Sequence, residues 1–213
     1  MEVENVTQIL IYFHAGLGGI ALLAGLIALS TTKGSPVHKK TGRAFFYTML
    51  ASALLAVLIA CLPGHKSPFL FAIGIFSIYL LVGGFLSLRF KQKELNIVFD
   101  KIVSWTMIVA GVGMITYPLL LEGAINIVLM VFGMVGLIFA VRDLRFYQNQ
   151  ENLRKIWLRF HLVKMTSGYI AAVTAFVVVN NVFPSFYGWF IPGIIGTVFI
   201  TYWVNKVKKK ALV

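Results

Sequence analysis

The chain has 213 residues, of which 59% are hydrophobic and only 12% charged, and its formal net charge is +12 at pH 7. Soluble domains average about 45–50% apolar and about 25% charged residues, so this composition excludes an ordinary soluble protein and predicts an integral membrane protein. Cys61 is the single cysteine, which excludes an intramolecular disulfide and paired-cysteine metal sites.

Seven apolar runs follow one another, each long enough to cross roughly 30 Å of hydrocarbon. They cover about residues 7–30, 44–62, 68–88, 102–121, 124–141, 160–181 and 187–204. Because unpaired backbone groups are costly in lipid, each run is expected to be helical. The first run is far longer than a signal-peptide core, so we expect it to be retained. The sequence therefore predicts an all-α bundle of seven transmembrane helices forming a single domain over residues 1–213.

Basic residues are concentrated in the segments that follow the first, third, fifth and seventh runs. Short loops rich in Lys and Arg stay in the cytoplasm, which predicts an outer N-terminus and an inner C-terminus, as in a bacterial inner (plasma) membrane. This alternation argues against nucleic acid as the partner of the positive charge and favours anionic lipid head groups. It leaves open a protein partner or a homo-oligomer.

Two proline-containing dipeptides mark local features of the helices. Ser35-Pro36 matches an N-cap followed by Pro at the first helical position, so the second helix is expected to begin near Pro36. Pro192-Gly193 falls inside the last run and predicts a kink.

Ionisable groups at membrane depth are functional candidates because they are costly there. His14, His161 and Lys164 are the clearest cases. Lys164 is near the inner end of its span, where its side chain is expected to snorkel to the interface. Asp100 and Asp143 are expected at the inner ends of their spans and not deep within them, which counts against a proton-coupled carrier.

Small residues share a helical face with each membrane-depth histidine. They are Gly18, Ala21, Gly25 and Ala28 after His14, and Gly168, Ala172 and Ala175 after His161. Such a face either lets a neighbouring helix approach closely or makes room for a flat cofactor such as haem.

The four histidines fall into two pairs. His14 and His65 are expected near the outer face, and His38 and His161 near the inner face. Axial histidines can hold haem iron, and two such sites would let electrons cross the membrane. Alternatively, His14, His65 and Glu122 could bind a divalent metal such as zinc.

Two segments resemble a known family. They are residues 37–43, Val-His-Lys-Lys-Thr-Gly-Arg, and residues 157–176, which begin Trp-Leu-Arg-Phe-His. Together with His14 they resemble an uncharacterised bacterial family of membrane proteins, domain of unknown function 2306, and His-x-x-x-Gly-Arg is similar to strings in b-type membrane cytochromes. The resemblance implies a multi-pass membrane protein and marks motif positions without assigning roles. These positions are His14, His38, Arg43, His161 and Thr174.

The sequence does not specify an enzymatic activity. The leading hypothesis is a His-ligated haem b, or another metal, used for electron transfer at the membrane. One alternative is a small-molecule transporter with a hinge at Pro192-Gly193 and a path lined by Lys164, Asn180 and Tyr117. Another is a non-catalytic membrane subunit that binds a partner through its basic inner face.

Overall fold

The computed structural model describes residues 2–121, 123–183 and 187–210. This part of the chain folds into seven α-helices and one 3₁₀-helix, η1. They are α1 (Glu2–Ser30), α2 (Pro36–Ile59), α3 (Pro68–Leu86), η1 (Ser87–Arg89), α4 (Val98–Leu121), α5 (Ile127–Phe146), α6 (Gln150–Val179) and α7 (Tyr187–Lys210). All seven α-helices are long and apolar enough to cross a membrane. The prediction of an all-α chain with seven such helices is therefore confirmed.

Two helices begin with the same local signal. The Ser35 hydroxyl accepts a hydrogen bond from the backbone N–H of His38, and Pro36 occupies the first helical position. Ser67 caps α3 in the same way by accepting from the N–H of Leu70. A side-chain oxygen at the N-cap satisfies a backbone donor that the helix leaves free, and Pro lacks that donor. The predicted start of the second helix is thus confirmed.

The segment between the fifth and sixth apolar runs differs most from the sequence-based boundaries. Helix α5 continues to Phe146 and α6 begins at Gln150, so the predicted polar connection shrinks to residues 147–149. The added turns bury Tyr147 and Leu153 in an apolar cluster with Phe90. A polar sequence continues as helix here because one face of it packs against the protein.

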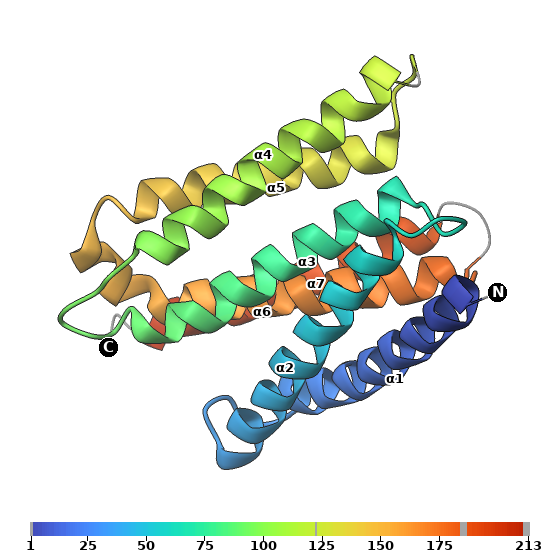
Figure 1. Cartoon of the computed structure of the whole chain (residues 1–213). Coiled ribbons are helices and arrows are strands. Elements are labelled where there is room, and N and C mark those ends of the chain that lie inside the picture. Colours follow the sequence, from blue (N-terminus) through green and yellow to red (C-terminus); the bar gives the residue numbers. More distant parts are fainter. Residues whose placement is uncertain (1, 122, 184–186, 211–213) are drawn as a thin grey trace.

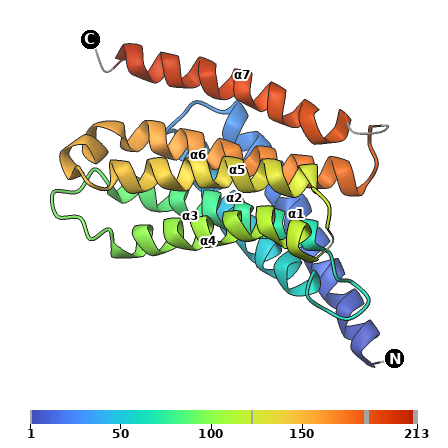
Figure 2. The ribbon, with the colours of Figure 1, turned by 90° about the horizontal axis from the view of Figure 1, so that it is seen from above.

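The helices form layers around α3 and α6 (Figure 1). Helix α3 contacts α2, α4, α5 and α6 and is the most buried of the seven. The α4–α5 hairpin covers one side of this central pair and the α1–α2 hairpin the other. Helix α7 packs on α6 at the margin of the bundle, as Figure 2 shows from above. Side chains that point inward from α3, α5 and α6 therefore meet in the interior.

Successive helices run in opposite directions, so the basic connecting segments gather at one end of the bundle (on the left of Figure 1). We call this the basic end. It contains residues 31–35, 90–97 and 147–149 and the C-terminal turns of α7. The other end, called the opposite end, contains the start of α1 and residues 60–67. This arrangement supplies the charge asymmetry that membrane topology requires.

Large apolar side chains cover much of the outer surface. Val109 is 71% exposed and Leu120 is 80% exposed, and similar residues are distributed over the other helices. Exposed apolar surface of this extent is unfavourable in water and matches the hydrocarbon of a bilayer. The seven long apolar helices and their exposed apolar side chains thus indicate a membrane protein.

Candidate functional site

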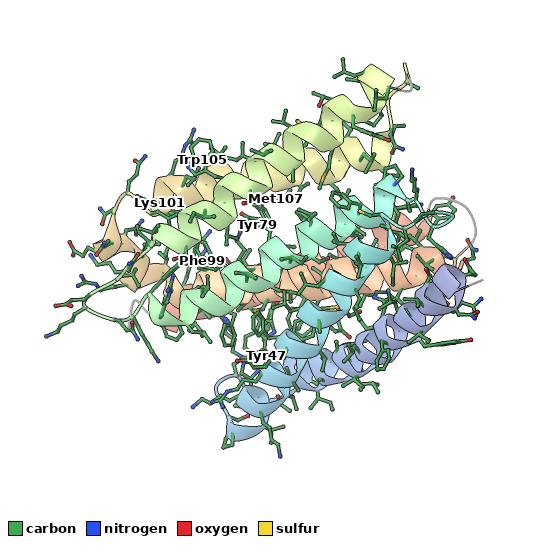
Figure 3. The ribbon with its side chains drawn as sticks, viewed as in Figure 1. Tyr47, Tyr79, Phe99, Lys101, Trp105 and Met107 are labelled. Atoms are coloured by element: carbon green, nitrogen blue, oxygen red, sulfur yellow. The ribbon has the colours of Figure 1, made fainter. Side chains whose placement is uncertain are left out.

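Three polar side chains from three helices meet inside the bundle. The Lys164 ammonium on α6 donates a hydrogen bond to Oδ2 of Asp143 on α5, at 2.5 Å. The hydroxyl of Tyr79 on α3 donates to the same oxygen, also at 2.5 Å. Lys164 is 3% exposed and Asp143 is 4% exposed. In Figure 3, Tyr79 lies in the interior between α3 and the α4–α5 hairpin. We call these residues the Tyr79–Asp143–Lys164 triad.

Aromatic rings complete the surroundings of the lysine. Its ammonium lies 3.6 Å from the centroid of the Tyr79 ring and 5.4 Å from that of Phe160. A buried charge is tolerated when an opposite charge and hydrogen bonds compensate its lost hydration, and an aromatic face adds attraction for the cation. The expected snorkelling of Lys164 is therefore wrong, because Asp143 offers a nearer partner than water.

A second ion pair, whose carboxylate is buried, joins η1 to α4. The Arg89 guanidinium donates to Oδ2 of Asp100, which is 2% exposed. Within the described residues, Arg89 Nε, Asp100 Oδ1 and the hydroxyl of Ser104 are buried without a protein partner. Buried polar atoms of this kind are commonly satisfied by ordered water. Asp100 and Asp143 thus lie near the ends of α4 and α5, as expected, and both are buried there in ion pairs.

Two pockets lie at different levels of the bundle. One, of about 450 Å³, lies near the basic end between α5, α6 and α7 and is lined in part by Asp143 and Lys164. The other, of about 500 Å³, is lined in part by Cys61 and Tyr117. Lys164 and Tyr117 thus line separate pockets, and Asn180 is the exposed C-cap of α6. The structure does not bring these three residues of the transport hypothesis together, although Pro192 does lie inside α7.

The histidine on α1 is held by α2. Nδ1 of His14 lies 2.9 Å from the backbone oxygen of Ser52 and 2.9 Å from its hydroxyl. The Ser52 hydroxyl in turn donates to the backbone oxygen of His14 at 3.0 Å. Since a carbonyl oxygen only accepts, Nδ1 carries the proton in the bond to it and Nε2 of the neutral ring is an acceptor.

The two histidines near the basic end have the same arrangement. Nδ1 of His38 donates to the backbone oxygen of Ala28 at 2.9 Å, and Nδ1 of His161 donates to that of Gly84 at 2.8 Å. A histidine that ligates a metal commonly donates its other ring N–H to a carbonyl or carboxylate, which fixes the ring and its tautomer. This arrangement leaves Nε2 of both rings available to accept.

His65 differs from the other three histidines. Its Nε2 lies 3.4 Å from the carboxylate of Glu4. Glu4 precedes His14 by ten residues on α1, which corresponds to about 15 Å of helix. The two histidines of the expected outer pair therefore have separate partners. Glu122, the third residue of the alternative metal site, lies outside the described residues, and among those described no group of three His, Cys, Asp or Glu could hold a metal.

The small-residue faces beside the histidines are filled by neighbouring helices. A Cβ on Gly25 would lie 2.5 Å from the Tyr169 ring, and one on Gly18 would lie 3.2 Å from the Ser52 hydroxyl. A Cβ on Gly168 would lie 3.2 Å from Leu81. These glycines thus allow close helix packing, which was one of the two alternatives that the sequence left open.

Two further motif positions have simple environments. Arg43 is exposed on α2, one turn after His38. Thr174 is buried, and its hydroxyl donates to the backbone oxygen of Ile170 at 2.9 Å. Neither residue touches the triad through a hydrogen bond or ion pair.

Comparison of the chain with protein-family models, curated proteins and solved structures found no match.

Proposed function

We propose that the protein transfers electrons at the membrane through a b-type haem held by His38 and His161. The observation that carries the proposal is the shared orientation of these two rings, each with Nδ1–H donated to a backbone carbonyl and Nε2 left as an acceptor. Haem iron in membrane cytochromes takes axial imidazole nitrogens, which the Nε2 atoms of these two rings would supply. When bound, haem would supply reversible one-electron exchange.

The residues around the histidines would hold and orient the ligands. The carbonyls of Ala28 on α1 and Gly84 on α3 each fix one ring, and such partners also raise the basicity of the ligating nitrogen. Lys39 and Arg43 are exposed near His38 on α2 and would place positive charge close to the anionic haem propionates. The resemblance of residues 38–43 to strings in b-type cytochromes points the same way.

The direction of the chain in the membrane is part of the proposal. The basic segments at one end of the bundle favour a cytoplasmic location for that end and for the C-terminus. The histidine pair would then be near the cytoplasmic face of a bacterial inner membrane. An electron donor in the cytoplasm would reach such a site more readily than one outside.

The test is a visible absorption spectrum of the protein purified in mild detergent from cells supplied with iron and a haem precursor. We expect a Soret band that shifts when the protein is reduced, and about one haem per chain by extraction. His38→Ala and His161→Ala should each abolish the Soret band of haem bound by two histidines. His65→Ala is the matched control and should leave it unchanged, because His65 contacts Glu4 instead.

The possible outcomes separate this proposal from its alternatives. A colourless protein from haem-replete cells would contradict it. Retention of the spectrum in both His38→Ala and His161→Ala would move the ligands elsewhere and contradict the assignment. A second haem that is lost only in His14→Ala would add a site near the middle of α1, where His14 has the same carbonyl-bonded Nδ1.

A further inference from the structure

We infer that the pocket between α5, α6 and α7 binds a phosphate ester through Arg142 and Arg159. The pocket has a volume of about 450 Å³, within the roughly 300–1,000 Å³ typical of small-molecule sites. His38 and His161 do not line it. The inference therefore stands apart from the haem proposal, and each can fail without the other.

The charge of the pocket is the first argument. Arg142, Arg159 and Lys164 line it together with one carboxylate, that of Asp143. Lys164 and Asp143 neutralise each other at 2.5 Å, so two positive charges remain. Within residues 2–121, 123–183 and 187–210, neither arginine has a carboxylate within ion-pair distance. Two unpaired cations beside a pocket favour an anionic occupant.

The kind of donor is the second argument. An arginine offers five N–H groups in a planar fork that matches the oxygens of phosphate, often through two parallel hydrogen bonds. Asn152, Thr201 and Asn205 also line the pocket and add amide and hydroxyl donors. These side chains together offer more hydrogen-bond donors than the two oxygens of a single carboxylate can accept, whereas a phosphate ester has additional oxygens.

The apolar part of the pocket indicates what the phosphate is attached to. Phe139, Phe146 and Phe160 line the pocket beside the charged groups. The Arg142 guanidinium lies 5.9 Å from the centroid of the Phe146 ring, which holds the cation at the pocket wall. The α5 and α7 helices on either side carry exposed apolar residues such as Ile138 and Val198. An ester with an apolar portion would use both kinds of surface, and its source is either an anionic lipid or a small soluble phosphate.

The experiment compares three forms of the purified full chain. Arg142→Gln with Arg159→Gln removes both unpaired charges of the pocket. Arg145→Gln with Arg154→Gln removes the same charge from the same two helices outside the pocket and is the matched control. Native mass spectrometry measures retained phosphatidylglycerol against phosphatidylcholine, and titration calorimetry measures the Kd for glycerol 3-phosphate.

We expect the pocket variant to weaken binding at least about tenfold, the equivalent of one charge-assisted hydrogen bond, and the control to change it less than about twofold. Loss of phosphatidylglycerol alone would identify a lipid, and loss of glycerol 3-phosphate binding would identify a soluble ester. Equal losses in both variants, or no binding of either probe to the unmodified protein, would overturn the inference. If the Gln variant does not fold, Arg142→Lys with Arg159→Lys keeps the charge and should still weaken binding several-fold because it loses the forks.

Discussion

Removing the charge of Asp143 should destabilise the bundle strongly. In Asp143→Asn, Lys164 stays buried beside an amide that no longer neutralises it, and Tyr79 loses a charged acceptor. Breaking a buried ion pair by removing one partner typically costs about 3–5 kcal/mol. A loss of about 3 kcal/mol corresponds to roughly a hundredfold fall in the ratio of folded to unfolded protein.

The assay is reversible unfolding in mixed micelles with increasing SDS, followed by far-UV circular dichroism. Glu151→Gln is the control, since Glu151 and Lys155 form an exposed pair at 3.2 Å whose loss should be too small to resolve. The double variant Asp143→Asn with Lys164→Met removes both charges and should recover most of the lost stability. The reasoning is refuted if Asp143→Asn unfolds like Glu151→Gln, or if the double variant is less stable than Asp143→Asn.

Two further predictions concern packing and topology. Gly25→Ala should lower the free energy of unfolding in the same assay by about 1–3 kcal/mol, because its Cβ would lie 2.5 Å from the Tyr169 ring. Gly16→Ala is the control and should cause no loss, because a Cβ there would meet no neighbouring atom within 4 Å. Equal effects of the two substitutions would show that α1 is not packed as described. Cys61 is exposed near the opposite end and should react with a membrane-impermeant maleimide in intact cells; labelling only in inverted vesicles would reverse the proposed orientation.

The seven helices follow from the sequence because hydrocarbon thickness sets their length and apolar composition reports it directly. Local signals were also sufficient for the start of α2, where Ser35 and Pro36 act through neighbouring backbone groups. The ends of α5 and α6 were not predictable in the same way. Their added turns are polar with a loose stripe of apolar residues, which allowed a short surface helix but did not fix the helix ends, and Tyr147 and Leu153 of that stripe pack in the folded bundle.

The triad could not be derived from hydropathy because its residues are distant in sequence. Tyr79 precedes Asp143 by 64 residues, so spacing along the chain does not join the two. A usable signal did exist for the other two, since Asp143 and Lys164 are opposite charges at a similar level of consecutive spans. Snorkelling was expected because Lys164 was placed from the hydropathy of its own span alone, without its partner Asp143 on the preceding span. Similarly, the orientation of the histidine rings depends on carbonyls of other helices, which spacing along one helix cannot reveal.

The shared contact of Asp143 and Lys164 has a consequence for how the chain enters the bilayer during synthesis. Helices α5 and α6 are joined by three residues, 147–149, and each carries one half of the pair. Inserted singly, each helix would bring an uncompensated charge towards the hydrocarbon, which is unfavourable by about 2.5–3.5 kcal/mol near the centre of a span and less near its end. Entering together as a hairpin, they would bring in a neutral pair. Biogenesis should therefore favour joint insertion of α5 and α6, with α7 docking against α6 afterwards and closing the pocket that lies between α5, α6 and α7.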